Sequence, residues 1–198
     1  MHTTDISLAY KERNIKVKLK ANKAFLQSEL KRDSENRIII DMNVKDDSDF
    51  LSVYSTGEVP VINGEVAEFI ENNTASVNPK ENLTLRIYST VIDDEEKALY
   101  KKAIKSYYTE KYKANGIELK KAHIISAILL IMGIFVLALA VLADYFFESD
   151  VWPEVIDIFA WVLIWESADI SIFKSNLLRT NKKRYSSFIN MNVEYPED

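Results

Sequence analysis

Residues 124–143 read Ile-Ile-Ser-Ala-Ile-Leu-Leu-Ile-Met-Gly-Ile-Phe-Val-Leu-Ala-Leu-Ala-Val-Leu-Ala, which is twenty positions without a charge. A helix rises about 1.5 Å per residue, so a helix of this length matches the hydrocarbon thickness of a bilayer. The core helix of a soluble protein rarely stays apolar on every face for so long. The stretch therefore predicts a transmembrane helix and indicates that the chain is an integral membrane protein.

A second apolar segment, residues 155–173, begins after a short linker. It is also long enough to cross a bilayer, and Pro153 and Glu154 are residue types that suit a helix start. A short connection favours antiparallel neighbouring helices. We therefore expect a helical hairpin, with the first transmembrane helix and its flanks in residues 120–147, an external loop in 148–154 and the second helix in 155–173.

The charges that flank these segments predict their orientation in the membrane. Residues 144–157 contain five acids and no base, whereas cations lie before the first segment and after the second: Lys111, Lys113, Lys120, Lys121, Lys174, Arg179, Lys182, Lys183 and Arg184. Positively charged flanks stay on the cytoplasmic side of a membrane. We therefore expect a multi-pass protein of the cell membrane with both termini in the cytoplasm.

Small residues recur every seven positions along the first apolar segment, at Ser126, Gly133 and Ala140. Such a stripe allows another helix backbone to approach closely. The stripe either packs the two helices of the hairpin together or mediates self-association of the protein.

Two acidic residues, Glu166 and Asp169, fall inside the second apolar segment. A carboxylate at the centre of a membrane helix costs about 2.5–3.5 kcal/mol, so such residues normally face a partner or a cavity. An antiparallel register predicts that Glu166 lies near mid-membrane opposite residues 131–133, which offer no cation, and that Asp169 reaches Ser126. Three interpretations remain: a structural carboxyl group, a proton or ion pathway in an oligomer, or recognition of a partner helix.

Residues 37–119 predict a small cytosolic α+β domain. The pattern of β-branched, alternating and amphipathic residues places each element, and Asn115-Gly116 resembles a helix C-cap. We expect a strand over 37–44, a helix over 64–72, a strand over 83–88, and a helix from the acidic run 93–96 to about Ala114.

In the cytosolic tail, residues 174–198, the sequence predicts a strand over 188–195. Its Ile189-Asn190-Met191-Asn192-Val193 resembles the Ile40–Val44 part of the first strand. We expect this C-terminal strand to pair with the strand before the membrane, so that both ends of the chain build the soluble domain. The predicted fold class is thus membrane α+β: a transmembrane hairpin with a small cytosolic domain.

Residues 1–36 form a basic N-terminal segment, with eight basic and three acidic residues in the first 32. This segment is either a solvated basic face or a contact with anionic lipid of the inner leaflet. The chain as a whole has a net charge of −5, and only Tyr10 and Phe25 could stack bases in the basic stretch. We therefore expect no nucleic-acid partner.

No catalytic constellation is recognisable. The chain has no cysteine, two histidines and four glycines, which excludes disulfides and thiolate metal sites and leaves no glycine-rich phosphate loop. Asp41 with the run Asp46-Asp47-Ser48-Asp49 could hold a divalent cation, but its spacing does not match an EF-hand. We assign no catalytic residue, no metal ligand and no cofactor.

Three stretches, Asp46–Leu51, Glu65–Asn72 and Phe159–Ile170, resemble a group of small two-helix membrane proteins of Gram-positive bacteria. Together the similarity covers most of residues 37–195. The resemblance implies a hairpin in the bacterial inner membrane. It implies no activity and therefore no catalytic residue.

Three functions follow from these patterns, in order of preference. The first is a membrane-anchored interaction or signalling module, with a protein partner or self-association besides the lipid bilayer. The second is an oligomeric ion or proton conductor that uses Glu166 and Asp169. The third is an enzyme with a carboxylate-bound metal.

Overall fold

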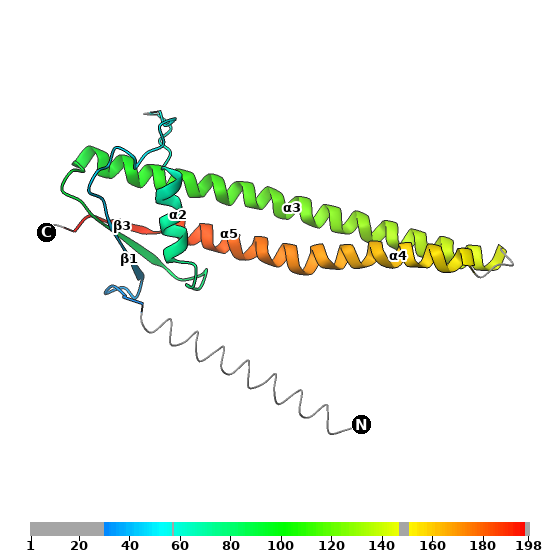
Figure 1. The fold of residues 1–198 in the computed structure, drawn as a ribbon. Coiled ribbons are helices and arrows are strands. Elements are labelled where there is room, and N and C mark those ends of the chain that lie inside the picture. The colour runs from blue at the N-terminus through cyan, green and yellow to red at the C-terminus, as the bar shows by residue number, and fades with distance from the viewer. Residues whose placement is uncertain (1–29, 57, 147–150, 197–198) are drawn as a thin grey trace, which may run out of the picture. The chain divides into compact units, whose positions relative to one another are not determined.

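The computed structural model describes residues 30–56, 58–146 and 151–196 (Figure 1). The chain divides into two compact units. In the described residues, the sheet unit comprises 30–105 and 190–196, and the hairpin unit comprises 106–189. Most of the predicted basic segment, residues 1–29, and positions 148–150 of the predicted loop lie outside the described residues.

The sheet unit contains three parallel strands in the order β1-β2-β3. Strand β1 spans Ile38–Asn43, β2 spans Leu83–Tyr88 and β3 spans Asn192–Glu194. Ile38 pairs with Leu83, and Leu85 pairs with Val193. The predicted strands over 37–44 and 83–88 are confirmed.

Side-chain alternation explains why these segments form strands. In β1 the buried residues are Ile38, Ile40 and Met42, and the residues between them are more exposed. The central strand β2 buries residues on both faces, including Leu85 and Thr84. This is the pattern expected of a strand in a parallel sheet whose two faces are both covered.

Helix α2 (Gly64–Asn73) lies in the crossover connection between the parallel strands β1 and β2. It confirms the helix predicted over 64–72. The side chain of Asn63 caps its first turn by accepting the backbone N–H of Glu65. At the other end, the Thr74 hydroxyl donates to the carbonyl of Ile70 at 2.8 Å. Ala67 and Ile70 are the buried residues of the helix.

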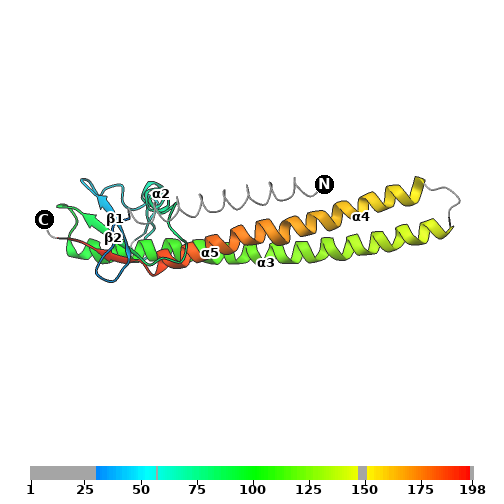
Figure 2. The same ribbon diagram turned by 90° about the horizontal axis from the view of Figure 1, so that it is seen from below.

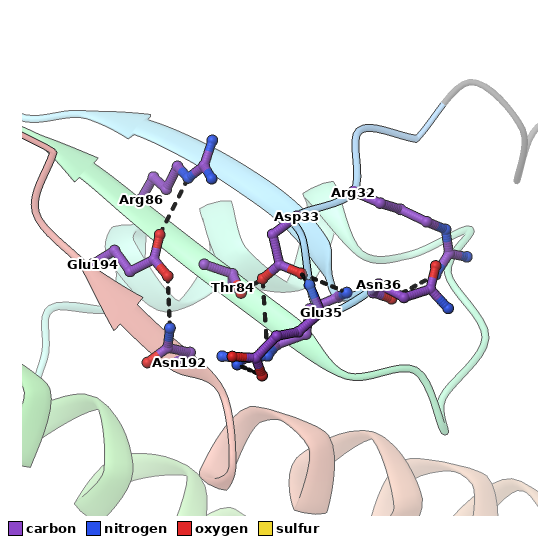
Figure 3. Close-up of polar contacts among 9 residues, drawn as sticks. Arg32, Asp33, Glu35, Asn36, Thr84, Arg86, Asn192 and Glu194 are labelled. Atoms are coloured by element: carbon purple, nitrogen blue, oxygen red, sulfur yellow. Dashed lines mark hydrogen bonds and ion pairs between the residues drawn. The ribbon is translucent and has the colours of Figure 1, made fainter.

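The C-terminal strand completes the sheet by pairing with a strand that precedes the hairpin, as predicted, but it is shorter than predicted. Residues 188 and 189 are helical, so only Asn192–Glu194 is strand, and it pairs with β2 rather than with β1. The outer edge of β1 is already used, because Ile39 donates its N–H to the carbonyl of Lys31 at 2.9 Å. The Glu194 carboxylate then accepts from the Arg86 side chain at 3.3 Å (Figure 3).

Asp33 holds the turn that precedes β1. Its carboxylate accepts the Thr84 hydroxyl at 2.7 Å and the backbone N–H of Arg37 at 2.9 Å (Figure 3). Asn36 in the same turn has a φ of 63°, a left-handed conformation that asparagine tolerates better than most residues. Burial opposes the charged form of Asp33, but these hydrogen bonds and the charges of Arg37 and Arg86 together outweigh it, so its pKa lies below the ordinary value.

Helix α3 (Asp94–Phe146) starts where the acidic run predicts and ends far beyond it. Asp93 and Glu96 form a capping box, because each carboxylate accepts the backbone N–H of the other residue, at 2.8 and 2.9 Å. The predicted C-cap at Asn115-Gly116 is wrong, since the helix continues through both residues. The Asn115 amide instead donates to the carbonyl of Leu178 at 2.7 Å.

Three consecutive helical segments return alongside the hairpin part of α3 (Figures 1 and 2). They are α4 (Val151–Asp169), the π-helical turn η1 (Ile170–Lys174) and α5 (Ser175–Ile189). The C-terminal tail is therefore helical from residue 175 to 189, where no helix is predicted from the sequence. Its buried residues include Leu178 and Phe188, and Phe188 packs on Tyr108 of α3 with ring centroids 4.6 Å apart.

Candidate functional site

The interface between α3 and the returning segments α4, η1 and α5, here called the seam, is built from small residues. The structure places all three members of the predicted stripe, Ser126, Gly133 and Ala140, at buried positions of α3. Facing segments contribute further small buried residues: Ala160, Ser167 and Ser175. Small side chains on both helices let the backbones approach closely.

Gly133 marks a point of very close approach. A Cβ atom added there would lie 2.6 Å from Cγ1 of Ile164, 3.2 Å from the Ile164 nitrogen and 3.3 Å from the Ala160 carbonyl oxygen. Two of these three neighbours are backbone atoms, which cannot move without shifting α4. By contrast, a Cβ on Gly116 would meet only Nζ of Lys182, at 4.0 Å.

Ser126 and Ser167 form a reciprocal pair across the seam. The Ser126 hydroxyl lies 2.9 Å from the Ser167 carbonyl, the Ser167 hydroxyl lies 2.8 Å from the Ser126 carbonyl, and the two hydroxyl oxygens are 3.1 Å apart. Both residues are buried. This pair fixes the register of α3 against α4.

The register corrects the predicted position of the acidic residues. Because Ser167 contacts Ser126, the adjacent Glu166 lies at about the level of Ala127 and not opposite residues 131–133. Ser126 is bonded to Ser167, so the expected contact between Ser126 and Asp169 is also wrong. Glu166 and Asp169 are both exposed on the outside of the hairpin, and neither forms an ion pair or hydrogen bond with a described residue.

The π-helical turn η1 shifts the buried face of the second arm of the hairpin (α4, η1 and α5) by one residue. Ala160 and Ser167 lie seven residues apart in the seam, and the same spacing would bring Lys174 into it. The extra residue of the wider turn instead buries Ser175 and leaves Lys174 exposed. Both the backbone N–H and the hydroxyl of Ser175 bond to the carbonyl of Ile170.

The outside of the hairpin is apolar over a long stretch. Among the described residues, α3 alone is long and apolar enough to cross a membrane; α4 carries four acids. Exposed large apolar residues nevertheless lie on both arms: Ile124, Ile125, Ile128, Leu130, Ile131, Met132, Ile134, Phe135, Leu139, Val141 and Leu142 on the first, and Val155, Ile158, Phe159, Trp161, Val162, Trp165, Ile172, Phe173 and Leu177 on the second. A soluble monomer rarely exposes a contiguous apolar surface of this size.

The sheet unit contains an open pocket of about 260 Å³ at the carboxyl end of β1, beside the first turn of α2. In open α/β sheets, ligands commonly bind outside the carboxyl ends of the strands. Apolar side chains of Met42, Phe50, Val66 and Phe69 line the pocket. The charged residues around it are Lys45, Asp46, Asp49 and Glu65, which give its rim a negative balance.

Tyr100 holds the loop that carries the acidic rim. Its ring stacks on Phe50 with centroids 4.2 Å apart, and its hydroxyl donates to the Asp47 carboxylate at 3.0 Å. Burial and this carboxylate raise the pKa of Tyr100, so the hydroxyl remains a donor at physiological pH. A hydrogen bond from the Ser48 backbone lowers the pKa of Asp46, which keeps this rim carboxylate charged.

The carboxylates of Asp41 and the run Asp46–Asp49 do not come together as a cation site. Asp41 pairs with Lys31, Asp47 accepts from Tyr100 and Asp46 accepts from Ser48, so these carboxylates face different partners. Within residues 30–56, 58–146 and 151–196, no three His, Cys, Asp or Glu residues gather closely enough to hold a metal ion. The carboxylate-metal enzyme gains no support from this arrangement.

Searches against models of protein families, curated proteins and solved structures find no match to this chain. The resemblance to two-helix membrane proteins of Gram-positive bacteria therefore stays a prediction from the quoted stretches.

Proposed function

We propose that the protein is a membrane-anchored interaction module whose hairpin crosses the bilayer twice. The apolar outer surface of both arms supports this, since lipid is the environment that such a surface requires. The four acids of α4 oppose a crossing, but the cost of about 2.5–3.5 kcal/mol applies to a carboxylate at the centre of a membrane helix. Glu166 and Asp169 lie toward the cytoplasmic end of the apolar stretch, at about the level of Ala127 and Ile124. The basic residues at the open end of the hairpin support an orientation with both termini in the cytoplasm, and only the resemblance supports a bacterial membrane.

The pocket of the sheet unit is the observation that supports a binding role. Its apolar floor and acidic rim match a protein segment that carries an apolar side chain next to lysine or arginine. Glu65 lies in the first turn of α2 and balances the positive end of that helix, so the pocket does not favour an anion. We therefore propose that a basic, partly apolar segment of a partner protein docks there.

Photo-crosslinking in native membranes tests this role. We expect a photo-reactive p-benzoylphenylalanine in place of Phe69, which lines the pocket and is 38% exposed, to capture a discrete partner. The same group in place of Val53, which is 83% exposed and does not line the pocket, is the matched control. Adducts of equal yield at both positions, or none at position 69, would contradict the proposal.

Charge neutralisation at the rim sharpens the test. Two exposed ion pairs contribute up to about 1 kcal/mol each, so we expect Asp49→Asn with Glu65→Gln to reduce the adduct at position 69 by about tenfold. Glu68→Gln with Glu95→Gln removes the same charge from exposed positions that do not line the pocket, and we expect it to leave the yield unchanged. If the partner does not contact the acidic rim, the adduct yield at position 69 would be the same in both double variants.

An ion or proton conductor is the second candidate, and the position of Glu166 and Asp169 favours it. Both carboxylates lie on the outside of the hairpin, where a single copy would present them to lipid. The seam between the arms is filled by close contacts at Gly133 and Ser126, so a pathway would have to run between copies. Proton flux into liposomes that Glu166→Gln abolishes would favour conduction over the interaction module.

A further inference from the structure

A second pocket, of about 390 Å³, lies between α3 and α5 inside the hairpin unit. Its lining contains no acidic residue: Tyr112, Leu119, Arg179, Lys182, Lys183 and Ser186. None of its three cations forms an ion pair with a described residue, whereas Lys113 on the same helix pairs with Glu110 at 2.7 Å. The pocket therefore gathers unneutralised positive charge in a concave site.

Neighbouring groups hold two of these cations in place. The Arg179 guanidinium lies 3.1 Å from Nε2 of His123, and Nδ1 of the same ring lies 2.7 Å from the Leu119 carbonyl. This arrangement fits the tautomer in which Nδ1–H donates to the carbonyl and Nε2 accepts from Arg179. Lys182 lies over the Tyr112 ring, with Nζ 4.9 Å from its centroid.

The position of the pocket along the hairpin identifies its environment. In the hairpin unit, exposed large apolar residues extend from Ile117 on α3 to Leu177 on α5. Leu119 and Arg179, which line the pocket, lie within about two helical turns of those limits. If the hairpin crosses a bilayer as proposed above, the pocket lies at the level of the phospholipid headgroups on the cytoplasmic side.

We propose that this pocket binds the phosphate group of an anionic phospholipid from the inner leaflet. Arginine and lysine are the side chains that recognise phosphate, and basic pockets between membrane helices on the cytoplasmic side bind anionic headgroups. The Tyr112 hydroxyl adds a neutral donor, and Leu119 offers an apolar surface to the lipid glycerol and chains. A free phosphate would satisfy the cations equally well, but it would gain nothing from Leu119 or from the adjoining apolar surface.

Native mass spectrometry of the full-length protein in detergent tests this site, with phosphatidylglycerol and phosphatidylcholine as probes. We expect the wild-type protein to retain phosphatidylglycerol preferentially. Neutralising the pocket with Arg179→Gln, Lys182→Gln and Lys183→Gln should lower the retained fraction by about tenfold or more, and Lys182→Gln alone should give an intermediate loss.

The matched control removes three cations that do not line the pocket, with Lys120→Gln, Lys121→Gln and Lys174→Gln. We expect this variant to keep most of the lipid. Equal loss in both triple variants, or no preference for phosphatidylglycerol, would overturn the site. Displacement of the lipid by millimolar inorganic phosphate would overturn the lipid as its source. Release of the wild-type protein from membranes by alkaline carbonate would instead contradict the membrane crossing, and it is measured separately.

Discussion

Replacing Gly133 with leucine is expected to separate the two arms of the hairpin. Even a Cβ at this position would lie 2.6 Å from the Ile164 side chain and close to two backbone atoms of α4. Overpacking of this kind costs about 1–3 kcal/mol, so a penalty near 2 kcal/mol would lower the ratio of packed to separated arms by about thirtyfold. The hydrogen bonds between Ser126 and Ser167, about two helical turns away, would also weaken.

Disulfide formation between cysteines at positions 126 and 167 provides the measurement. The two hydroxyl oxygens are 3.1 Å apart, and the chain contains no other cysteine. We expect rapid cross-linking in an otherwise unchanged protein and slow cross-linking when Gly133→Leu is added. Gly116→Ala is the control, because it meets only Nζ of Lys182 and replaces a poor helix former. Unchanged cross-linking with Gly133→Leu would show that the arms are not packed at this point.

Deleting residues 191–198 is expected to destabilise the sheet unit strongly. The deletion removes β3 from the edge of β2, the ion pair from Arg86 to Glu194 and the side chain of Met191, which is 6% exposed. Loss of a buried methionine side chain alone costs about 2–5 kcal/mol. Hydrogen exchange should show the amides of Leu83–Tyr88 losing protection, while those of the hairpin seam keep theirs.

The variant Glu194→Gln distinguishes the stabilisation that comes from the strand from the stabilisation that comes from its ion pair. The pair is partly exposed, so we expect its loss to cost less than about 1 kcal/mol and to leave the protection of β2 nearly unchanged. If the deletion has no larger effect than this single substitution, β3 contributes nothing to the stability of the sheet.

Local patterns predicted the elements of the sheet unit well. The amphipathic pattern of residues 64–72 and the alternation in Leu83–Tyr88 are short-range signals, and α2 and β2 form where those signals lie. The end of α3 could not be found in this way. Asn115-Gly116 matches a helix stop, but the Asn115 amide bonds to Leu178, a residue 63 positions away. Such a partner exists only once the hairpin has formed.

In the candidate sites, too, local patterns were predictable from the sequence and contacts between distant residues were not. The seven-residue spacing of Ser126, Gly133 and Ala140 was visible in one helix, yet the partner Ser167 was not identified, because the linker alone does not determine the register. From the sequence alone, Arg179 and Lys182 stand out only as charges that flank the membrane segments. A helical period of buried residues through Leu178 and Phe188 could have placed them on α5 and opposite Tyr112.

Cysteine accessibility in intact cells tests the central claim, a hairpin that crosses the membrane twice with the sheet unit inside. The chain has no cysteine of its own, so single exposed positions can be labelled cleanly. A membrane-impermeant maleimide is expected to label Glu154→Cys, near the start of α4, in intact spheroplasts, and to label Ser76→Cys of the sheet unit only after permeabilisation. Labelling of both positions in intact spheroplasts, or of Ser76→Cys alone, would contradict the account.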